Sequence, residues 1–284
     1  MGCFPLEKQF SDGFPMDWPF RIDMNASSEV NNWAKMETNG LIDNIVTSGN
    51  ITTLTLLVLA NALYFKGAWV ERFNVSRTRN YDFYPPTGQP AVPVPFMTSK
   101  RDQCIGTYKG SKVLRLRYKQ ASDVNHCFSM CIFLPNERDG LRDQMERACS
   151  EQGFLNDPAP YMEVEVGEFR IPKFKIMSKF GNVCGFLAKL DVHLGCLPVV
   201  AVDQVIPHSN IVQNAFVKVN EEGPEAAAVT AVVTKFGCGI SSWPKLYVDF
   251  VADRPFMFVI REEMTGVVLF VGQKSGLSSL GYVP

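Results

Sequence analysis

Side chains that could carry out covalent chemistry are few in this chain. Its three histidines are His126, His193 and His208, and none lies in a nucleophile or zinc-binding motif. The sequence has no Gly-x-Ser-x-Gly element, no His-Glu-x-x-His element and no glycine-rich phosphate loop. A catalytic pair of Cys238 and His208 stays open, because such partners can meet only in the folded chain. The residues therefore favour a protein that is not an enzyme.

The cysteines indicate free thiols rather than a cross-linked or metal-binding scaffold. There are eight of them, irregularly spaced, and two of these, Cys127 and Cys131, lie in an apolar, strand-like run. No spacing matches a zinc site, and a disulfide framework is typical of shorter secreted chains. We expect a reducing compartment and neither metal nor cofactor.

Length and charge limit the possible classes further. A chain of 284 residues can bury a sizeable core, and its net charge of −1 and pI near 6.3 give no basic surface for nucleic acid. Met1 to Phe20 lacks the uninterrupted apolar core of a secretory signal. With no repeat, linker or membrane-spanning run, residues 1–284 are expected to form a single domain of a monomeric protein. The cytoplasm is the expected location, with the extracellular space as the alternative.

One stretch has the composition of a segment with two conformations. Glu221, Glu222 and Gly223 follow the strand-like run Val217 to Val219, and Ala226 to Val233 are then all small or β-branched and uncharged. Small residues suit a loop, whereas valine and threonine suit a strand. On composition alone, an ordinary surface loop is the simpler interpretation.

The remaining pattern predicts helices mixed with strands, an α+β fold. Ser27 or Ser28 caps a helix from Glu29 to Glu37, which ends at Asn39-Gly40. The nearly continuous apolar run Leu54 to Phe65 predicts a central strand covered on both faces, in which Asn61 needs hydrogen-bond partners.

The other predicted elements follow from alternation and turn residues. Arg72 to Pro95 is interpreted as a connecting segment. Strands and helices are expected at Lys112 to Tyr118 (strand), Cys127 to Leu134 (strand), Leu141 to Glu151 (helix), Met162 to Val166 continuing as Phe169 to Phe174 (strand), and Ser178 to Leu194 (weakly helical).

Several short motifs, in order along the chain, resemble those of the serpin family, and in spelling those of plant serpins. They are Glu29 to Trp33, Thr38 to Gly40, Asn61 to Trp69, Val94 to Met97, Ser129 to Pro135, Ile171 to Phe174, Asn214 to Gly223, Glu225 to Ala228, Val248 to Phe258 and Thr265 to Gly272. The resemblance implies a large mixed main β-sheet with smaller β-sheets and surrounding helices. It covers roughly Glu29 to Gly272. The first 28 residues read as a divergent extension, and the family's amino-terminal helices have no clear counterpart, so the fold is expected to be truncated at its amino terminus.

The resemblance also implies a function and its residues. Serpins inhibit serine or cysteine proteases: the protease cleaves a reactive-centre loop, here residues 220–245, and the loop then inserts into the main sheet. The scissile region would be Lys235, Phe236, Gly237 and Cys238, and the hinge Glu221, Glu222, Gly223, Pro224, Glu225, Ala226, Ala227 and Ala228. The shutter and breach, where the sheet parts, would include Asn61, Trp69 and Gln213.

Three residues depart from the family pattern. Pro224 stands where the family prefers threonine or serine, Gln213 where a shutter histidine is expected, and Arg254 where histidine is usual. Proline lacks the amide hydrogen that a central strand needs. The alternative is therefore a non-inhibitory, truncated serpin-like protein that is a protease substrate or a binding module.

Overall fold

The computed structural model describes residues 26–47, 57–65, 67–120, 126–151, 153–155, 160–180, 209–222 and 247–276. Two α-helices and three β-sheets in these ranges confirm the predicted α+β class. In chain order the elements are α1 (Ala26–Glu37), β1 (Leu57–Tyr64), the 3-10 helix η2 (Val75–Arg77), β2 (Arg79–Phe83), β3 (Val92–Met97), β4 (Gln103–Tyr108), β5 (Ser111–Arg117), β6 (Phe128–Pro135), α2 (Leu141–Ser150), β7 (Glu163–Val164), β8 (Phe169–Pro172), β9 (Phe174–Phe180), β10 (Ser209–Val219), β11 (Phe250–Val251), β12 (Phe256–Glu262) and β13 (Val268–Lys274).

The chain divides into two compact units. One comprises Met1–Phe65 with Ile176–Val217, and the other comprises Lys66–Lys175 with Lys218–Pro284. The boundaries between the units fall inside β9 and β10, so both strands have residues in each unit. The expectation of a single domain over residues 1–284 stays a prediction.

The first unit is built on a sheet with the strand order β1-β10-β9. β1 and β10 are parallel and pair along their length, from Leu57 opposite Ser209 to Tyr64 opposite Phe216. A strand is therefore found where the apolar run predicted one. Among the described strands, however, β1 lies at the end of this sheet and not at its centre.

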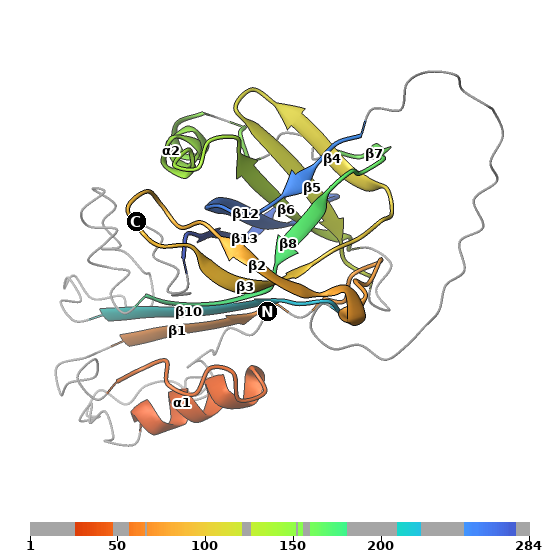
Figure 1. The fold of residues 1–284 in the computed structure, drawn as a ribbon. Coiled ribbons are helices and arrows are strands. Elements are labelled where there is room, and N and C mark those ends of the chain that lie inside the picture. The colour runs from red at the N-terminus through yellow and green to blue at the C-terminus, as the bar shows by residue number, and fades with distance from the viewer. Residues whose placement is uncertain are drawn as a thin grey trace, which may run out of the picture. The chain divides into compact units, whose positions relative to one another are not determined.

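Helix α1 packs on this sheet, as Figure 1 shows for α1, β1 and β10. Their contact is an apolar cluster made of Val30, Ala34, Ile42, Ile45, Val46, Ala60, Ala62, Val212 and Phe216. The predicted end of the helix is confirmed, because Asn39 and Gly40 have φ angles of 50° and 78°. The predicted start is wrong: the helix begins at Ala26, so Ser27 and Ser28 lie inside it and cannot cap it.

Polar side chains of α1 fix the segment that follows the helix. The Asn31 carboxamide oxygen accepts hydrogen bonds from the backbone amides of Ile45 and Val46, both at 2.9 Å, and its Nδ2 donates to the Val46 carbonyl at 2.8 Å. The Thr38 hydroxyl accepts from the Ile42 amide at 3.0 Å. These bonds satisfy backbone groups that the turn would otherwise bury without partners.

The second unit contains a four-stranded sheet, β11-β8-β3-β2, and a six-stranded sheet, β13-β12-β6-β5-β4-β7. The prediction that Arg72 to Pro95 only connects other elements is wrong, because it contains β2 and the first half of β3. Two features hid these strands: β3 carries Pro93 and Pro95, and β2 buries only Phe83. Prolines argue against a strand and β2 buries a single side chain, so the prediction recognised neither strand.

Most other predicted elements of this unit are confirmed. Strands β5 and β6 and helix α2 lie within one residue of their predicted positions. The predicted strand from Met162 is reduced to β7, two residues long, and Pro172 ends β8. The weakly helical prediction is wrong for Ser178 to Phe180, which belong to β9, and its remainder lies outside the described residues.

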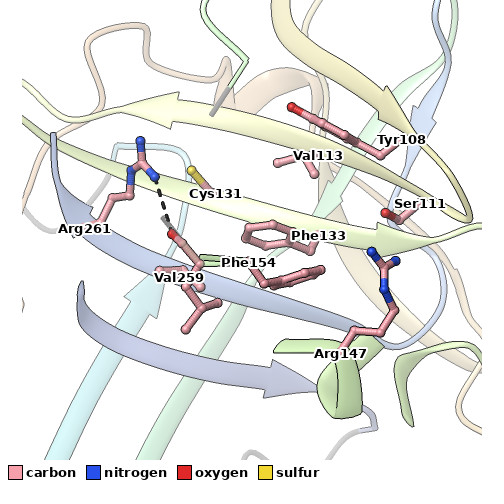
Figure 2. A pocket seen from close by; sticks show the side chains of 10 residues that line it. Tyr108, Ser111, Val113, Cys131, Phe133, Arg147, Phe154, Val259 and Arg261 are labelled. Atoms are coloured by element: carbon pink, nitrogen blue, oxygen red, sulfur yellow. Dashed lines mark hydrogen bonds between the residues drawn. The ribbon is translucent and has the colours of Figure 1, made fainter. Parts of the chain in front are cut away.

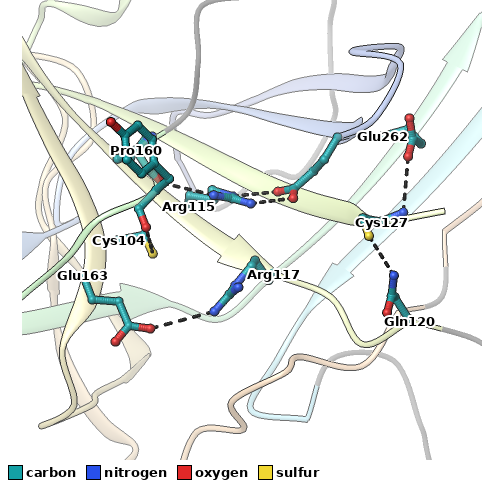
Figure 3. A network of polar contacts seen from close by, with 10 residues as sticks. Cys104, Arg115, Arg117, Gln120, Cys127, Pro160, Glu163 and Glu262 are labelled. Carbon is teal, nitrogen blue, oxygen red and sulfur yellow. Dashed lines mark hydrogen bonds and ion pairs between the residues drawn. The ribbon is translucent and has the colours of Figure 1, made fainter. Parts of the chain in front are cut away.

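A polar network connects the strands of the six-stranded sheet (Figure 3). The Arg115 guanidinium donates two hydrogen bonds to the Glu263 carboxylate, at 2.6 and 2.5 Å, and both side chains are largely buried. Nearby, Glu262 accepts from the Cys127 amide at 3.2 Å and from both the amide and the hydroxyl of Thr265 at 2.6 Å. The pKa of Glu262 is lowered to about 2, mainly by the hydrogen bonds from Thr265.

The four cysteines of the described residues are free, which agrees with the prediction for these positions. Cys104 and Cys131 are buried, and their burial raises the pKa of both thiols. Thiols with a raised pKa carry little thiolate at neutral pH and behave as small apolar side chains.

Helix α2 buries one polar side chain without a partner. The helix contacts β6 and β12, and the described residues at its interface with the sheet are otherwise mainly apolar. Gln144 is only 5% exposed, and neither its amide nitrogen nor its amide oxygen has a hydrogen-bond partner in the described part of the chain. A buried amide in this state costs free energy relative to an apolar group of similar shape.

We expect Gln144→Leu to stabilise the protein. The gain in the free energy of unfolding should be about 1–3 kcal/mol, because the substitution removes the desolvation cost of the amide. Chemical denaturation monitored by circular dichroism measures it. Arg142→Leu, which places the same side chain on the exposed side of α2, is the control. A Gln144→Leu protein that is no more stable than this control would contradict the interpretation.

Candidate functional site

The chain leaves β10 through residues 220–222, here called the exit segment, and residues 69–73 bind this segment. The Trp69 indole donates a hydrogen bond to the Asn220 carbonyl at 2.8 Å. The Trp69 amide donates to the Glu222 carbonyl at 3.3 Å, and the Phe73 amide donates to the Glu221 carbonyl at 2.9 Å. Three consecutive carbonyls of the exit segment therefore have donors from one short stretch of chain.

The Glu221 carboxylate adds a second set of contacts. It is buried, with 4% of the residue exposed, and accepts a hydrogen bond from the Thr78 hydroxyl at 2.7 Å. The Lys173 ammonium lies 3.0 Å from one of its oxygens and 2.8 Å from the other. Burial acts to raise the pKa of Glu221, but the hydrogen bonds from Lys173 and Thr78 outweigh it, so the pKa is below its ordinary value. The exit segment is thus held by a charged group that stays ionised at neutral pH.

Residues 69–73 are themselves anchored in the core of the second unit. Trp69 is 1% exposed and stacks on Tyr118, with ring centroids 4.4 Å apart and planes 18° from parallel. The Val70 amide donates to the Arg117 carbonyl at 2.9 Å, and Phe73 stacks on Phe169 at 6.2 Å. The surface that receives the exit segment is therefore built from buried aromatic side chains, which give it a fixed shape.

The other predicted switch residues lie in the first unit. Asn61 of β1 and Gln213 of β10 are register partners on adjacent strands, and both are half-buried. Directly opposite residues project from the same face of a sheet, so the two amides are neighbours. The sequence placed them 152 positions apart, and only the strand pairing brings them together.

Two hollows on the described part of the second unit are small. One, of about 60 Å³, lies between the six-stranded sheet and α2 and is lined by Cys131, Phe133, Phe154 and Arg261 among others (Figure 2). Another, of about 50 Å³, adjoins Trp69 and Phe73. Ligand pockets usually measure some 300–1,000 Å³, so both hollows are below the usual size of a site for an organic ligand. The described residues also contain no cluster of metal-binding side chains.

Several predicted site residues lie outside the described residues. These are the rest of the hinge, Gly223 to Ala228, and the scissile region, Lys235 to Cys238; their assignment stays a prediction. Two contacts of Glu221, with Lys173 and Thr78, were missed from the sequence. A signal existed for the first, because a glutamate at the end of a buried strand needs a cation, but nothing in the sequence selects one lysine among many.

In the described part of the chain, neither α-helix has the length and apolarity needed to span a membrane.

Comparison with known proteins places this arrangement in context. A family model described as "Serpin (serine protease inhibitor)" matches residues 8–275. Serpin-ZXA of Oryza sativa is 42% identical over 255 residues, which is 87% of this chain and 62% of the relative. The "Probable non-inhibitory serpin-Z5" of Arabidopsis thaliana is 42% identical over 277 residues, covering 95% of this chain and 59% of that protein.

A solved structure has the same fold. The structure of Arabidopsis AtSerpin1 in its "Native Stressed Conformation" superposes with a TM-score of 0.74 at 37% sequence identity, covering 88% of this chain and 65% of that one. This chain therefore spans about two thirds or less of the length of the proteins described here. The family match begins at residue 8, well before Glu29, so the resemblance extends further toward the amino terminus than the motifs indicated.

We expect Lys173→Met to destabilise the protein at neutral pH. It leaves the buried Glu221 carboxylate without its cation, and one hydrogen bond to a charged group contributes about 1–3 kcal/mol. Because the native pKa of Glu221 is lowered, this stabilisation is present above its ordinary pKa of 4.5 and is lost as the pH falls through the native pKa. The difference between the two proteins should therefore shrink as the pH falls below 4.5.

Denaturation at pH 7 and pH 3.5 measures this difference in stability. Lys179→Met, at an exposed position of β9, is the control and should have little effect. Equal losses for Lys173→Met at the two pH values would show that the ion pair with Glu221 is not the cause.

Proposed function

Because this chain belongs to the serpin family, we propose that it inhibits serine-type endopeptidases by offering residues 220–245 as bait and inserting the cleaved loop into a sheet. Inhibition of this kind requires a sheet that can accept a strand, a loop that can become one, and a fixed point from which the loop enters. Serpins inhibit proteases and are not catalysts themselves, so we assign this chain no enzymatic activity. Cysteine proteases are a second possible class of target.

The observation that carries the proposal is the direct parallel pairing of β1 with β10. The loop follows β10 in the chain, so a loop segment that folds back along β10 runs antiparallel to it. Since β1 is parallel to β10, a strand between them would be antiparallel to both. Insertion would exchange one parallel ladder for two antiparallel ladders, and antiparallel pairing is slightly more stable per residue.

The loop sequence fits a strand that forms late. Residues 226–233 are small or β-branched and uncharged, so they can be exposed as a loop and can still pack on a pleated surface. Charged side chains would have to be desolvated when the loop enters a sheet, and this stretch carries none. The predicted bait residues Lys235 to Cys238 follow directly.

The exit segment provides the fixed point. Its three carbonyls and the Glu221 carboxylate are bound by Trp69, Phe73, Thr78 and Lys173. Insertion would therefore begin two residues after Glu222, at Pro224. Proline has no amide hydrogen and cannot donate to the ladder, which penalises this first step by about 1–3 kcal/mol.

A second candidate function is supported by the same proline. A chain whose loop inserts slowly would be cut by the protease as a substrate and would release it unharmed. A relative of this chain from Arabidopsis thaliana is itself named a probable non-inhibitory serpin, which is in line with this second candidate. The two candidates differ in the product that a protease leaves.

Incubation with chymotrypsin-like, elastase-like and papain-like proteases distinguishes them. An inhibitor should give a covalent adduct that survives denaturing electrophoresis, with the loop cut between Lys235 and Cys238. The control is a protease inactivated at its nucleophile, which should give neither the adduct nor the cut. Complete cleavage by every protease of the panel without any adduct would favour the second candidate, a protein that proteases cleave as a substrate.

The cleaved protein should also melt at a higher temperature than the intact one. The severed loop can pair in the sheet and gain hydrogen bonds that the intact loop lacks. Differential scanning calorimetry before and after cleavage gives the shift. An unchanged melting temperature would show that the loop does not insert.

Pro224→Thr should increase the fraction of protease that is trapped. Threonine restores the amide hydrogen. If this lowers the insertion barrier by about 1.4 kcal/mol, insertion becomes about tenfold faster. Pro244→Thr is the matched control, because Pro244 lies beyond the predicted scissile region and is not expected to enter the sheet. If both substitutions, or neither, change the adduct yield, the first step of insertion is not limited by Pro224.

A further inference from the structure

We infer that Tyr161, Met162 and Tyr247, here called the distal patch, form a second contact surface for the protease that cleaves the loop. The inference deepens the proposed function and rests on it, because it assumes that a protease binds residues 235–238. It also describes that protease. Beside the part of its cleft that binds the residues after the cleaved bond, it should carry apolar or arginine side chains that pack on tyrosine and methionine.

The three side chains of the distal patch are large, partly apolar and exposed. Tyr161 is 75% exposed, Met162 is 68% exposed and Tyr247 is 61% exposed. Aromatic residues and methionine are enriched at protein interfaces, where they supply a large contact area. A group of such side chains indicates a binding surface, whereas a single exposed apolar residue does not.

A backbone hydrogen bond brings the three residues to the same part of the second unit. The Val248 amide donates to the Glu165 carbonyl at 3.0 Å, so Tyr247 lies beside the stretch that begins with Tyr161. Met162 is three positions before Glu165, a length of chain that spans at most about 10 Å. The distal patch is therefore formed by two neighbouring stretches, residues 161–162 and residue 247.

The first of these stretches is held by strands β4 and β5. Cys104 of β4 pairs with Glu163, and its thiol donates to the Tyr161 carbonyl at 3.8 Å. The Arg115 guanidinium of β5 donates to the Pro160 carbonyl at 3.5 Å (Figure 3). These contacts hold the backbone and leave the side chains of residues 161 and 162 exposed. A surface that is already ordered loses less conformational entropy when it binds a partner.

The second stretch is held just after Tyr247. The Asp249 carboxylate accepts a hydrogen bond from the Glu168 amide at 2.6 Å, and the Lys112 ammonium donates to the Asp249 carbonyl at 2.8 Å. Gly167 permits this approach, because a Cβ atom at its position would collide with the Asp249 carboxylate. Tyr247 is thus two residues from a fixed point of the second unit.

The length of the loop brings the protease to this surface. Tyr247 follows Cys238 by nine positions, so the end of the scissile region is at most about 30 Å from Tyr247. A protease domain of about 200 residues measures some 40 Å across. A protease that holds residues 235–238 in its cleft is therefore within reach of the distal patch. This tether favours the protease over an unrelated protein as the partner.

Ion pairs neutralise charged side chains beside the patch. Arg117 lies 3.8 Å from Glu163, and Arg170 lies 2.7 Å from Glu168. These pairs contribute no net charge, so we expect the patch to select its partner through apolar and aromatic contacts. An arginine of the protease could contribute as well, because guanidinium groups stack on tyrosine rings.

Single-turnover kinetics of loop cleavage test the inference, with chymotrypsin, elastase and papain as probes. For the protease that cleaves the wild-type loop fastest, the double variant Tyr161→Ser/Met162→Ser should need about a tenfold higher concentration to reach half the maximal rate. The maximal rate itself should not change, because the patch contributes equally to the bound state and to the transition state. Neither substitution lies in the loop, so the bait sequence stays intact.

The matched control is Met36→Ser, which removes a methionine that is 79% exposed on α1 of the first unit. It should be cleaved like the wild-type chain. If the double variant shows the same concentration dependence as wild type, the inference is wrong and the proposed function is unaffected. If none of the three proteases cleaves between residues 235 and 238, both are wrong.

A photo-cross-linker at position 162 tests the contact itself. Benzoylphenylalanine in place of Met162 should form a covalent complex under illumination with the fastest protease, inactivated at its nucleophile. The same amino acid in place of Met36 should not. No complex from position 162, or equal yields from the two positions, would refute the distal patch as a contact surface.

Discussion

The ion pair between the buried Glu221 carboxylate and Lys173 is the interaction on which the candidate site depends. It occurs at the point where a long strand, β10, gives way to the loop. A charge at this position could be buried only because a cation and a hydroxyl meet it there. These contacts therefore hold the chain directly after the end of β10.

Aromatic packing gives that ion pair a rigid frame. Trp69 and Phe73 stack on Tyr118 and Phe169, which belong to parts of the chain that are distant in the sequence. Their backbone amides can therefore hold the carbonyls of the exit segment without being displaced themselves. The parallel pair of β1 and β10 is different in kind: it is held by a regular ladder and a covering helix, and contains two neutral amides at its middle. The exit segment is thus held by side chains and aromatic packing, whereas β1 and β10 are held by backbone pairing and the apolar cluster with α1.

The sequence predicted much of this fold and less of the site. Regular alternation located β5, and turn residues bounded α2, because in both cases the signal lies within a few residues. β2 and β3 were missed because prolines and a mostly exposed surface conceal a strand that is defined only by its pairing. The motifs indicated the family and the importance of Glu221 and Trp69. They could not indicate that Lys173 is the partner of Glu221, because that contact depends on how separate strands come together.

The stacking of Trp69 has a spectroscopic consequence. Its indole lies against a phenol ring and donates its N–H to the carbonyl of Asn220, so the emission of this fluorophore depends on the same contacts that hold the loop in place. Departure of residues 220–222 would leave the indole without its acceptor and change the polarity around it. The molecule thus contains an intrinsic optical reporter for the contacts of residues 220–222.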